Sequence, residues 1–295
     1  MNVVVTGGGT IAPIDVVRQI TNVSSGRFSA AIAEACLGRG ATVWHVHAPA
    51  AQLPLWREAR FDLDTADPYA EHARLERLRR RWREIRDRLH LVPLPRGTVA
   101  DYAGTLKRVL RTSAIDVAFL AMAVSDFEPE PASGKLDSDA EALVVRGLPT
   151  PKVIRSVRDW SPVVYLVGFK LLSGADPSEL IRRAEEACRT NRADLTVAND
   201  LRTLSAGRHT VHLVRPGHPP ETLPPGDDLA DRLVARVFAW SAARPRGGDV
   251  PPAPRRPSDD MSRSESPWGA PDPRAVRQTS PPPWSTVPGP TAPGR

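Results

Sequence analysis

The sequence predicts an α/β fold built on a doubly wound, mostly parallel sheet. Short apolar runs alternate along the chain with segments of helical periodicity. The first apolar run ends at three glycines, and a helical segment and a second apolar run follow it, in the order of a βαβ unit. In such a sheet helices cover both faces, and ligands bind beside the carboxyl ends of the strands.

Each element rests on its own local pattern. Apolar runs predict strands at residues 2–6, 41–49, 89–94, 115–126, 163–169, 194–200 and 209–214. Helical spacing predicts helices at residues 27–37, 99–111, 177–191 and 227–242. In the first helix Phe28, Ile32 and Ala35 share one face, and Gly38 supplies its end.

One segment, "HARLERLRRRWREIRDRL" at residues 72–89, interrupts this alternation. Its apolar residues recur at three- and four-residue spacing: Leu75, Leu78, Trp82, Ile85 and Leu89. This spacing predicts an amphipathic helix with a densely basic outer face, within a helical insertion at about residues 68–89. A helix packed on its apolar stripe and solvated outside is favoured over one that binds nucleic acid.

Composition divides the chain of 295 residues into two parts. Residues 245–295 hold 14 of the 31 prolines and few aliphatic residues, so they are expected to form a disordered tail. The alternative is that Trp268 or Trp284 anchors a partner. Residues 1–244 carry the apolar runs and are expected to form one domain.

Charge and cysteine content narrow the function classes. The formal net charge of +6 is modest, so it does not require nucleic acid and suits anionic ligands equally well. Cys36 and Cys188 have no metal-ligand spacing, which favours small buried side chains in a reducing compartment. The sequence has no 18-residue apolar run and no signal-like N-terminus, so we expect a cytoplasmic protein without a membrane segment.

The glycines at residues 7–9 follow a strand, where a bare backbone can approach a phosphate closely. A nicotinamide dinucleotide site would need an acidic residue at the end of the second strand, but that strand runs into His47, Ala48 and Pro49. No tyrosine is followed by a lysine four residues later, as a short-chain dehydrogenase requires; Lys107 and Lys170 each come one place too late. A nicotinamide-dependent oxidoreductase is therefore disfavoured.

Three motifs near the N-terminus together resemble a known family. They are GGT at residues 8–10, PIDVVR at residues 13–18 and ITNVSSG at residues 20–26. In this order and spacing they resemble phosphopantothenoylcysteine synthetase, the phosphopantothenate–cysteine ligase of coenzyme A biosynthesis. Further similar stretches follow at residues 121–136, 149–154, 167–171 and 197–200, and the resemblance runs from Met1 to about Arg244. The residues VSDF at 124–127 and GFKL at 168–171 look closer to the free-standing form of the family than to the form fused to a decarboxylase domain.

The resemblance implies a Rossmann-like domain and a two-step ligation. The carboxylate of 4′-phosphopantothenate is activated as an acyl-nucleotidylate, and cysteine then displaces the nucleotide. A nucleoside triphosphate, either CTP or ATP, is the co-substrate, and Mg²⁺ accompanies it. The family pairs as homodimers, so a homodimer is also implied. No residues are identified as metal ligands.

The implied nucleotide site has a physical rationale. Backbone N–H groups at two turns and the start of a helix suit a triphosphate; these residues are Gly8, Gly9, Thr10, Ser24, Ser25 and Gly26. By resemblance, Lys135 places a cation on the α-phosphate, Phe169 packs on the base or ribose, and Asn199 bonds near the base.

The implied substrate site comprises Arg18, Asn22, Met122 and Asp126. By resemblance, Asn22 and Lys135 are the expected catalytic residues. The side-chain amide of Asn22 can support a developing oxyanion without titrating. The alternatives are an asparagine in a left-handed turn, a surface arginine at position 18 and a capping role for Asp126.

The chain also departs from the family pattern. Lys135 is followed by Leu136, Asp137 and Ser138, where many fused synthetases have further lysines. A catalytically degenerate nucleotide-binding protein of the same fold therefore stays as the alternative function, and the choice between CTP and ATP stays open.

Overall fold

The computed structural model describes residues 1–130, 142–205 and 208–244. The predicted tail at residues 245–295 and the predicted catalytic Lys135 lie outside the described residues. The fold described below belongs to the compact unit Met1–Val250.

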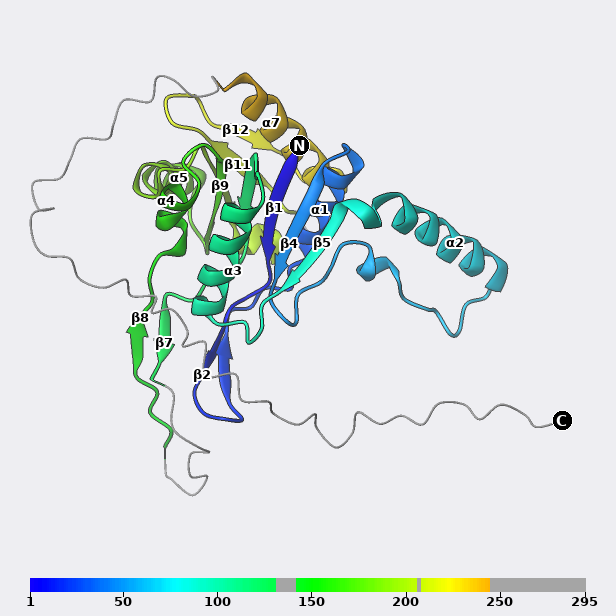
Figure 1. Cartoon of the computed structure of the whole chain (residues 1–295), viewed down its shortest axis with the longest axis horizontal. Coiled ribbons are helices and arrows are strands. Elements are labelled where there is room, and N and C mark those ends of the chain that lie inside the picture. The colour runs from blue at the N-terminus through cyan, green and yellow to red at the C-terminus, as the bar shows by residue number, and fades with distance from the viewer. Residues whose placement is uncertain (131–141, 206–207, 245–295) are drawn as a thin grey trace, which may run out of the picture. The chain divides into compact units, whose positions relative to one another are not determined.

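In the described part of the chain, eight strands form one twisted sheet in the order β12-β11-β10-β9-β6-β1-β4-β5 (Figure 1). The pairs from β10 to β5 are parallel, whereas β11 runs antiparallel to both β10 and β12. The bounds are β1 Asn2–Gly7, β4 Thr42–His47, β5 Leu89–Pro93, β6 Val117–Leu120, β9 Tyr165–Leu172, β10 Leu195–Asp200, β11 Val211–Val214 and β12 Glu221–Leu223. The predicted mostly parallel α/β sheet is confirmed.

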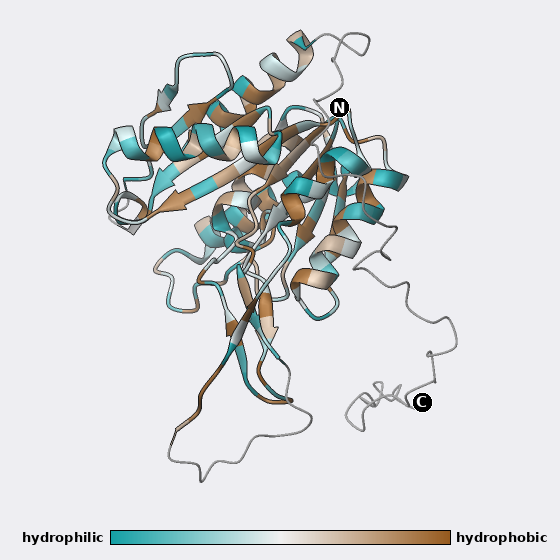
Figure 2. Cartoon of the chain, turned by 90° about the vertical axis from the view of Figure 1, so that its left-hand side faces the viewer, coloured by the Kyte–Doolittle hydropathy of each residue, from teal (hydrophilic) through white to brown (hydrophobic). Residues whose placement is uncertain are grey.

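Helices cover both faces of this sheet. Helices α1 (Arg27–Gly38) and α7 (Leu229–Ala243) pack together on one face, and α3 (Val99–Thr112), α4 (Val157–Trp160) and α5 (Pro177–Asn191) lie on the other. Two short helices, η3 (Val153–Ser156) and α6 (Leu201–Ser205), precede α4 and follow β10. The central strands are predominantly hydrophobic and the helices mixed (Figure 2), because helices cover both sides of strands such as β1 and β6, whereas a helix packed on the sheet buries one face.

Two hairpins project beyond the carboxyl edge of the sheet, and the apolar pattern did not predict them. They are β2 (Ile11–Pro13) with β3 (Gln19–Thr21), and β7 (Phe127–Pro129) with β8 (Gly147–Pro149). Strands β2 and β7 contact each other, so the hairpins lie side by side. Apolar side chains remain exposed on both; examples are Val16, Val17 and Phe127.

The strand predicted at residues 115–126 is shorter than expected. It ends at Leu120, and Met122 N then donates to Thr6 Oγ1 at 3.2 Å. Ala123 makes an isolated bridge with Gly9. The chain therefore leaves the sheet and runs under the glycine loop, which places the following residues at the sheet's carboxyl edge.

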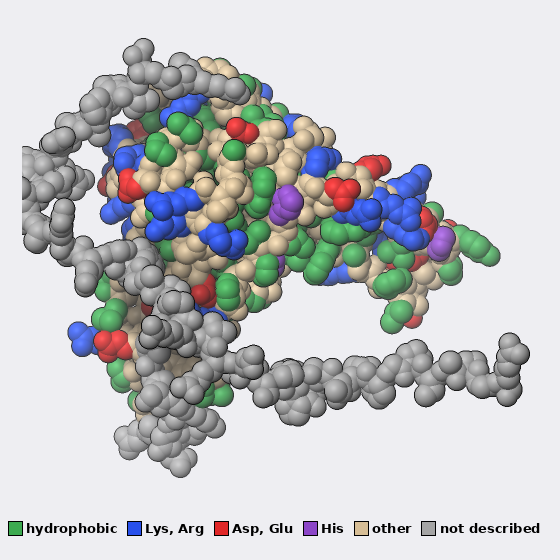
Figure 3. Space-filling model, in the orientation of Figure 1, with side chains coloured by type: hydrophobic (Ala, Val, Ile, Leu, Met, Phe, Trp, Pro, Cys, Tyr) green, Lys and Arg blue, Asp and Glu red, His purple; other side chains and the backbone are tan. Residues whose placement is uncertain are grey.

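The predicted basic helix is α2 (Pro68–Ile85), which stands between the short helices η1 (Trp56–Glu58) and η2 (Arg86–Arg88). We call residues 56–88 the arm. Asp67 Oδ1 caps α2 by accepting from Ala70 N at 2.9 Å. Of its apolar stripe, Trp82 and Ile85 pack against the core. Figure 3 shows basic side chains gathered along the arm beside exposed hydrophobic ones.

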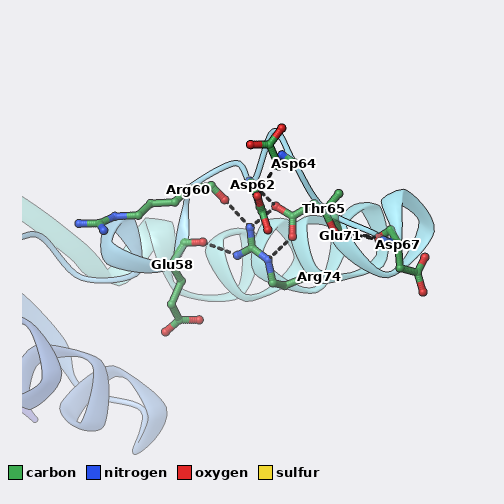
Figure 4. Close-up of polar contacts among 8 residues, drawn as sticks. All are labelled: Glu58, Arg60, Asp62, Asp64, Thr65, Asp67, Glu71 and Arg74. Atoms are coloured by element: carbon green, nitrogen blue, oxygen red, sulfur yellow. Dashed lines mark hydrogen bonds and ion pairs between the residues drawn. The ribbon is translucent and has the colours of Figure 1, made fainter.

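Arg74 holds the arm together (Figure 4). Its guanidinium donates to the backbone oxygens of Glu58 and Arg60, and it forms an ion pair with Glu71 at 2.6 Å. One side chain thus joins α2 to the loop that leads into it.

The end of the described domain is fastened to the amino edge of the sheet. Arg244 Nη1 contacts Asp194 at 3.2 Å and donates to Val164 O at 3.3 Å. Arg158 pairs with the same carboxylate at 2.6 Å. The chain that follows α7 is therefore tied to the segments preceding β9 and β10.

Candidate active site

The glycine loop after β1 is packed so tightly that side chains would not fit. Gly8 has a φ of 89°, and a Cβ there would lie 2.8 Å from the Cβ atoms of Ala48 and Ala51. A Cβ at Gly9 would lie 2.4 Å from the backbone oxygen of Asn22. The loop therefore requires glycine both for its backbone conformation and for close approach.

The second turn lies against this loop. Gly26, with a φ of 72°, is the N-cap of α1, and a Cβ on it would lie 3.2 Å from Gly8 N. Ser25 O accepts from Gln52 N at 2.9 Å, which fixes the turn to the chain after β4. We call residues 8–10 and 24–26 the cradle. It sits at the N-terminus of a 12-residue helix, where backbone N–H groups and the helix dipole favour an anion.

Asn22 lies beside the cradle and is half-buried. Its Nδ2 donates to Ala123 O at 3.2 Å, in the segment that passes under the glycine loop. Its φ is not positive, so the alternative of a left-handed turn residue is wrong. Thr21 Oγ1 donates to Thr10 O at 3.0 Å and ties the same segment to the first turn.

Thr10 connects the cradle to the segment between β6 and β7 that carries Asp126. Thr10 N donates to Ala123 O at 3.0 Å, and Thr10 Oγ1 accepts from Ser125 N at 2.9 Å. Asp126 is exposed and forms an ion pair with Lys152, which sequence reasoning did not identify. The structure thus brings Asn22 and Asp126 to the same edge as the cradle.

Asn199 is the next-to-last residue of β10, whereas Phe169 lies within β9, which runs on to Leu172, three residues beyond the predicted end. Phe169 meets Phe28 of α1 edge-on, with ring centroids 6.3 Å apart, and Phe28 meets His209 at 4.5 Å. His209 Nε2 is buried without a hydrogen-bond partner among the described residues, and burial lowers the pKa of this imidazole. Phe28 and His209 were not predicted as site residues, since they meet only where α1, β9 and β11 converge.

Two histidines stand behind the cradle on β4. His45 is fully buried and stacks on His47 with centroids 5.8 Å apart. Burial, with a smaller contribution from His47, lowers the pKa of His45 to about 3. Neither ring nitrogen has a partner of normal geometry among the described residues, although the backbone at Gln52 weakly favours the protonated form. A Cβ on Gly7 would lie 3.4 Å from His45 Cε1, so this ring packs directly under the glycine loop.

The remaining predicted substrate residues differ in exposure. Met122 is buried, with 7% of its surface exposed. Arg18 pairs with Asp15 at 3.0 Å, and the Asp15 carboxylate also accepts from the backbone N atoms of Val17 and Arg18. Asp15 therefore shapes the loop between β2 and β3 that presents Arg18, a role that its place in the PIDVVR motif did not reveal.

The described residues offer neither a metal-binding cluster nor a membrane-spanning helix. No group of three or more His, Cys, Asp or Glu side chains is arranged to hold a metal ion there. Among the described helices none is both long and apolar enough to cross a membrane.

Comparison with known proteins gives the family. The sequence profile described as "DNA/pantothenate metabolism flavoprotein C-terminal domain" matches residues 1–76 and 99–240. Phosphopantothenate–cysteine ligase 2 of Oryza sativa is 31% identical over 263 residues, covering 79% of this chain and 77% of its own. The bifunctional coenzyme A biosynthesis protein CoaBC of Thermococcus kodakarensis is 31% identical over 212 residues, covering 72% of this chain and 44% of its own. The chain thus spans less than half the length of that relative.

Solved structures agree on the fold. A DNA/pantothenate metabolism flavoprotein of Streptococcus pneumoniae superposes with a TM-score of 0.65 and 25% identity, covering 81% of this chain and 99% of its own. A Cab2 variant in complex with phosphopantothenate-cysteine superposes with a TM-score of 0.70 and 23% identity, covering 82% and 86%. From its fold and its sequence together, the chain belongs to the family of DNA/pantothenate metabolism flavoprotein C-terminal domains.

Proposed function

We propose that this chain is a phosphopantothenate–cysteine ligase of coenzyme A biosynthesis. The observation that carries the proposal is the contact between the two glycine turns at the N-terminus of α1, with Asn22 and Asp126 at the same edge. The similarity to a named ligase over 77% of that relative's length supports the same conclusion.

The proposed reaction has two steps. A carboxylate oxygen of 4′-phosphopantothenate attacks the α-phosphorus of the nucleoside triphosphate, and pyrophosphate leaves. The cysteine amine then attacks the acyl carbon, so that an amide forms and the nucleoside monophosphate leaves. Catalysis depends on holding the triphosphate and the carboxylate in line and on stabilising the charge that develops at the carbonyl.

The cradle would hold the triphosphate. Gly8, Gly9, Ser24, Ser25 and Gly26 line the meeting point of the two turns, where backbone dipoles favour phosphate. The N–H of Thr10 already donates to Ala123 O, so we place Thr10 in support of the loop.

The other roles follow from position. Asn22 would support the acyl carbonyl, and Arg18, Met122 and Asp126 would contact the phosphopantothenoyl group. Phe169 of β9 and Asn199, near the end of β10, would contact the base or ribose. Lys135, outside the described residues, is proposed as the cation at the α-phosphate.

A metal ion and a second subunit complete the proposal. Mg²⁺ would arrive with the triphosphate, whose oxygens are its preferred ligands. The exposed apolar side chains of the two hairpins, among them Val17 and Phe127, would be covered in a homodimer.

The cysteines fit a cytoplasmic location. Cys36 and Cys188 are buried and unbridged, as suits a protein of the reducing cytoplasm.

The test is pyrophosphate release. The purified full chain is incubated with 4′-phosphopantothenate, cysteine and Mg²⁺, with CTP and ATP supplied in separate reactions, and the condensed product is identified by mass spectrometry. Without cysteine we expect about one pyrophosphate per site, because the acyl-nucleotidylate accumulates. Tight nucleotide binding without pyrophosphate from either nucleotide would instead support the degenerate nucleotide-binding protein.

A further inference from the structure

Lys152 is a cation at the edge of the proposed active site; it lies within the similar stretch at residues 149–154, but the resemblance gave it no role. Its ammonium forms an ion pair with the carboxylate of Asp126, which lies 26 residues earlier in the chain. Both side chains are well exposed, at 44% for Lys152 and 65% for Asp126. The pair therefore faces the space above the sheet edge.

The backbone that carries Lys152 is fixed at this edge. Thr150 N donates to Asp126 O at 2.9 Å, and Thr150 Oγ1 donates to Ser125 O. Directly after Lys152, the buried Val153 begins η3, and Ile154 packs against Gly168, next to Phe169. Lys152 is thus held between Asp126, in the segment that follows β6, and η3, which packs against Gly168 of β9.

The pairing itself is weak enough to be exchanged. Exposed ion pairs contribute little stability in water, because solvent screens both charges. A triphosphate carries several negative charges and accepts stronger charge-assisted hydrogen bonds than one solvated carboxylate. An ammonium held beside Asp126, whose neighbour Ser125 bonds to Thr10 of the cradle, would therefore move to a bound triphosphate, and Asp126 would be left to accept from a substrate hydroxyl or amide.

We propose that Lys152 is a phosphate-binding residue of the active site, which Asp126 holds in place until a triphosphate replaces the carboxylate as its partner. This inference rests on the proposed function for the identity of the ligand. It names a lysine in the described part of the chain that would act in addition to Lys135.

Binding of inorganic tripolyphosphate with Mg²⁺, measured by calorimetry on the full chain, tests the proposal without turnover. Lys152→Ala should weaken binding by about ten- to a hundredfold, the range expected for losing a charged hydrogen bond. Lys152→Arg should recover part of that loss, because it keeps the charge. Lys107→Ala, a half-buried lysine of α3, is the matched control and should bind as the unmodified chain does.

The background of Asp126→Asn separates direct contact from simple charge neutralisation. If Lys152 touches phosphate, Lys152→Ala still weakens binding when Asp126 is already neutral. If Lys152 only masks the charge of Asp126, the loss disappears in that background, and the proposal is overturned. The unfolding temperatures of the unmodified chain, the two single variants Lys152→Ala and Asp126→Asn, and the double variant confirm that each protein is folded.

Turnover distinguishes this proposal from the proposed function. In the pyrophosphate assay, Lys152→Ala should raise KM for the nucleotide by a factor similar to its loss of tripolyphosphate affinity. An unmodified chain that binds tripolyphosphate but forms no pyrophosphate contradicts the ligase activity, while the binding result still decides the role of Lys152. An active chain in which Lys152→Ala changes neither binding nor KM contradicts the Lys152 proposal alone.

Discussion

The cradle and the arm are built in opposite ways. The cradle is held by backbone contacts so close that a single Cβ at Gly8 or Gly9 would collide, and buried His45 closes the space behind it. The arm is held at its base by Trp82 and Ile85 and internally by Arg74, while Tyr69 is 90% exposed. The family profile covers the cradle and omits residues 77–98, in the second half of the arm and beyond. Close packing thus coincides with the part of the chain that matches the family, whereas the protruding helix is kept with few contacts.

The largest loss of activity should come from a substitution of Asn22, which lies beside the cradle. Asn22→Asp keeps the shape but replaces the Nδ2 donor with a charged oxygen, which would face Ala123 O and the proposed acyl carbonyl. We expect pyrophosphate formation to fall by about 10²–10³-fold, as when an oxyanion donor is removed. Initial-rate assays measure this, with Asn191→Asp at the end of α5 as the control. Equal activity of the two variants would remove Asn22 from the catalytic residues.

Gly8→Ala tests whether the tight packing of the cradle matters for binding. The positive φ alone should cost about 1–2 kcal/mol, and the new Cβ must also displace Ala48 and Ala51. A displacement near 1 Å should lower activity by about a hundredfold. Gly40→Ala is the matched control, because Gly40 has a φ of 79° and open space around its missing Cβ. It should lose stability but keep activity, and a similar loss of activity in both would contradict the prediction.

The buried His45 should make the region of the cradle sensitive to acid. An unfolded histidine takes up a proton near pH 6.5, whereas the folded pKa of His45 is lowered to about 3. The unfolded state therefore binds more protons between these values, and stability falls as the pH drops through this window. Linkage gives a loss of about 2 kcal/mol between pH 7.5 and pH 5.

Denaturant unfolding at several pH values measures this loss. His45→Leu should flatten the acid limb, because both ring nitrogens lack partners of normal geometry among the described residues and an apolar side chain of similar size leaves none unsatisfied. The matched substitution on the arm, exposed His72→Leu, should leave the slope unchanged. An unchanged slope in His45→Leu would show that other groups cause the acid sensitivity.

The smallest effect on stability and activity should come from a substitution of Arg74 in the arm. Arg74→Ala removes the donors to Glu58 O and Arg60 O, so the loop before α2 should be cut more rapidly by trypsin or a similar protease. Pyrophosphate formation should not change, because among the described residues the Arg74 side chain bonds to Glu58, Arg60 and Glu71, none of which is a proposed site residue. Arg79→Ala, which removes only an exposed pair with Glu76, is the control. A loss of activity in Arg74→Ala would show that the arm supports the site.

Much of the fold follows from local patterns in the sequence. The central strands bury both faces, so their apolar runs predict β1, β4 and β10 with small errors at the ends. The two hairpins could not be predicted in this way, because β3 and β8 bury none of their residues and leave no alternation to detect. The early end of β6 depends on Thr6 and Gly9, which are distant in sequence.

The site was predictable only where its residues share a motif. Family resemblance placed the cradle, Asn22 and Asp126, and the structure brings them to one edge. Lys152 and His209 reach that edge through tertiary contacts with Asp126 and Phe28, and no spacing in the sequence announces those contacts. Their positions depend on neighbours supplied by other elements.

The tie between Arg244 and Asp194 has a practical consequence for dividing the chain. Asp194 O atoms are shared by two arginines, one from α4 and one from the last described position. Cutting the polypeptide just before position 244 would leave that carboxylate with Arg158 alone, whereas cutting just after it would keep both. A fragment that is to keep both ion pairs of Asp194 must therefore include Arg244, one residue past α7.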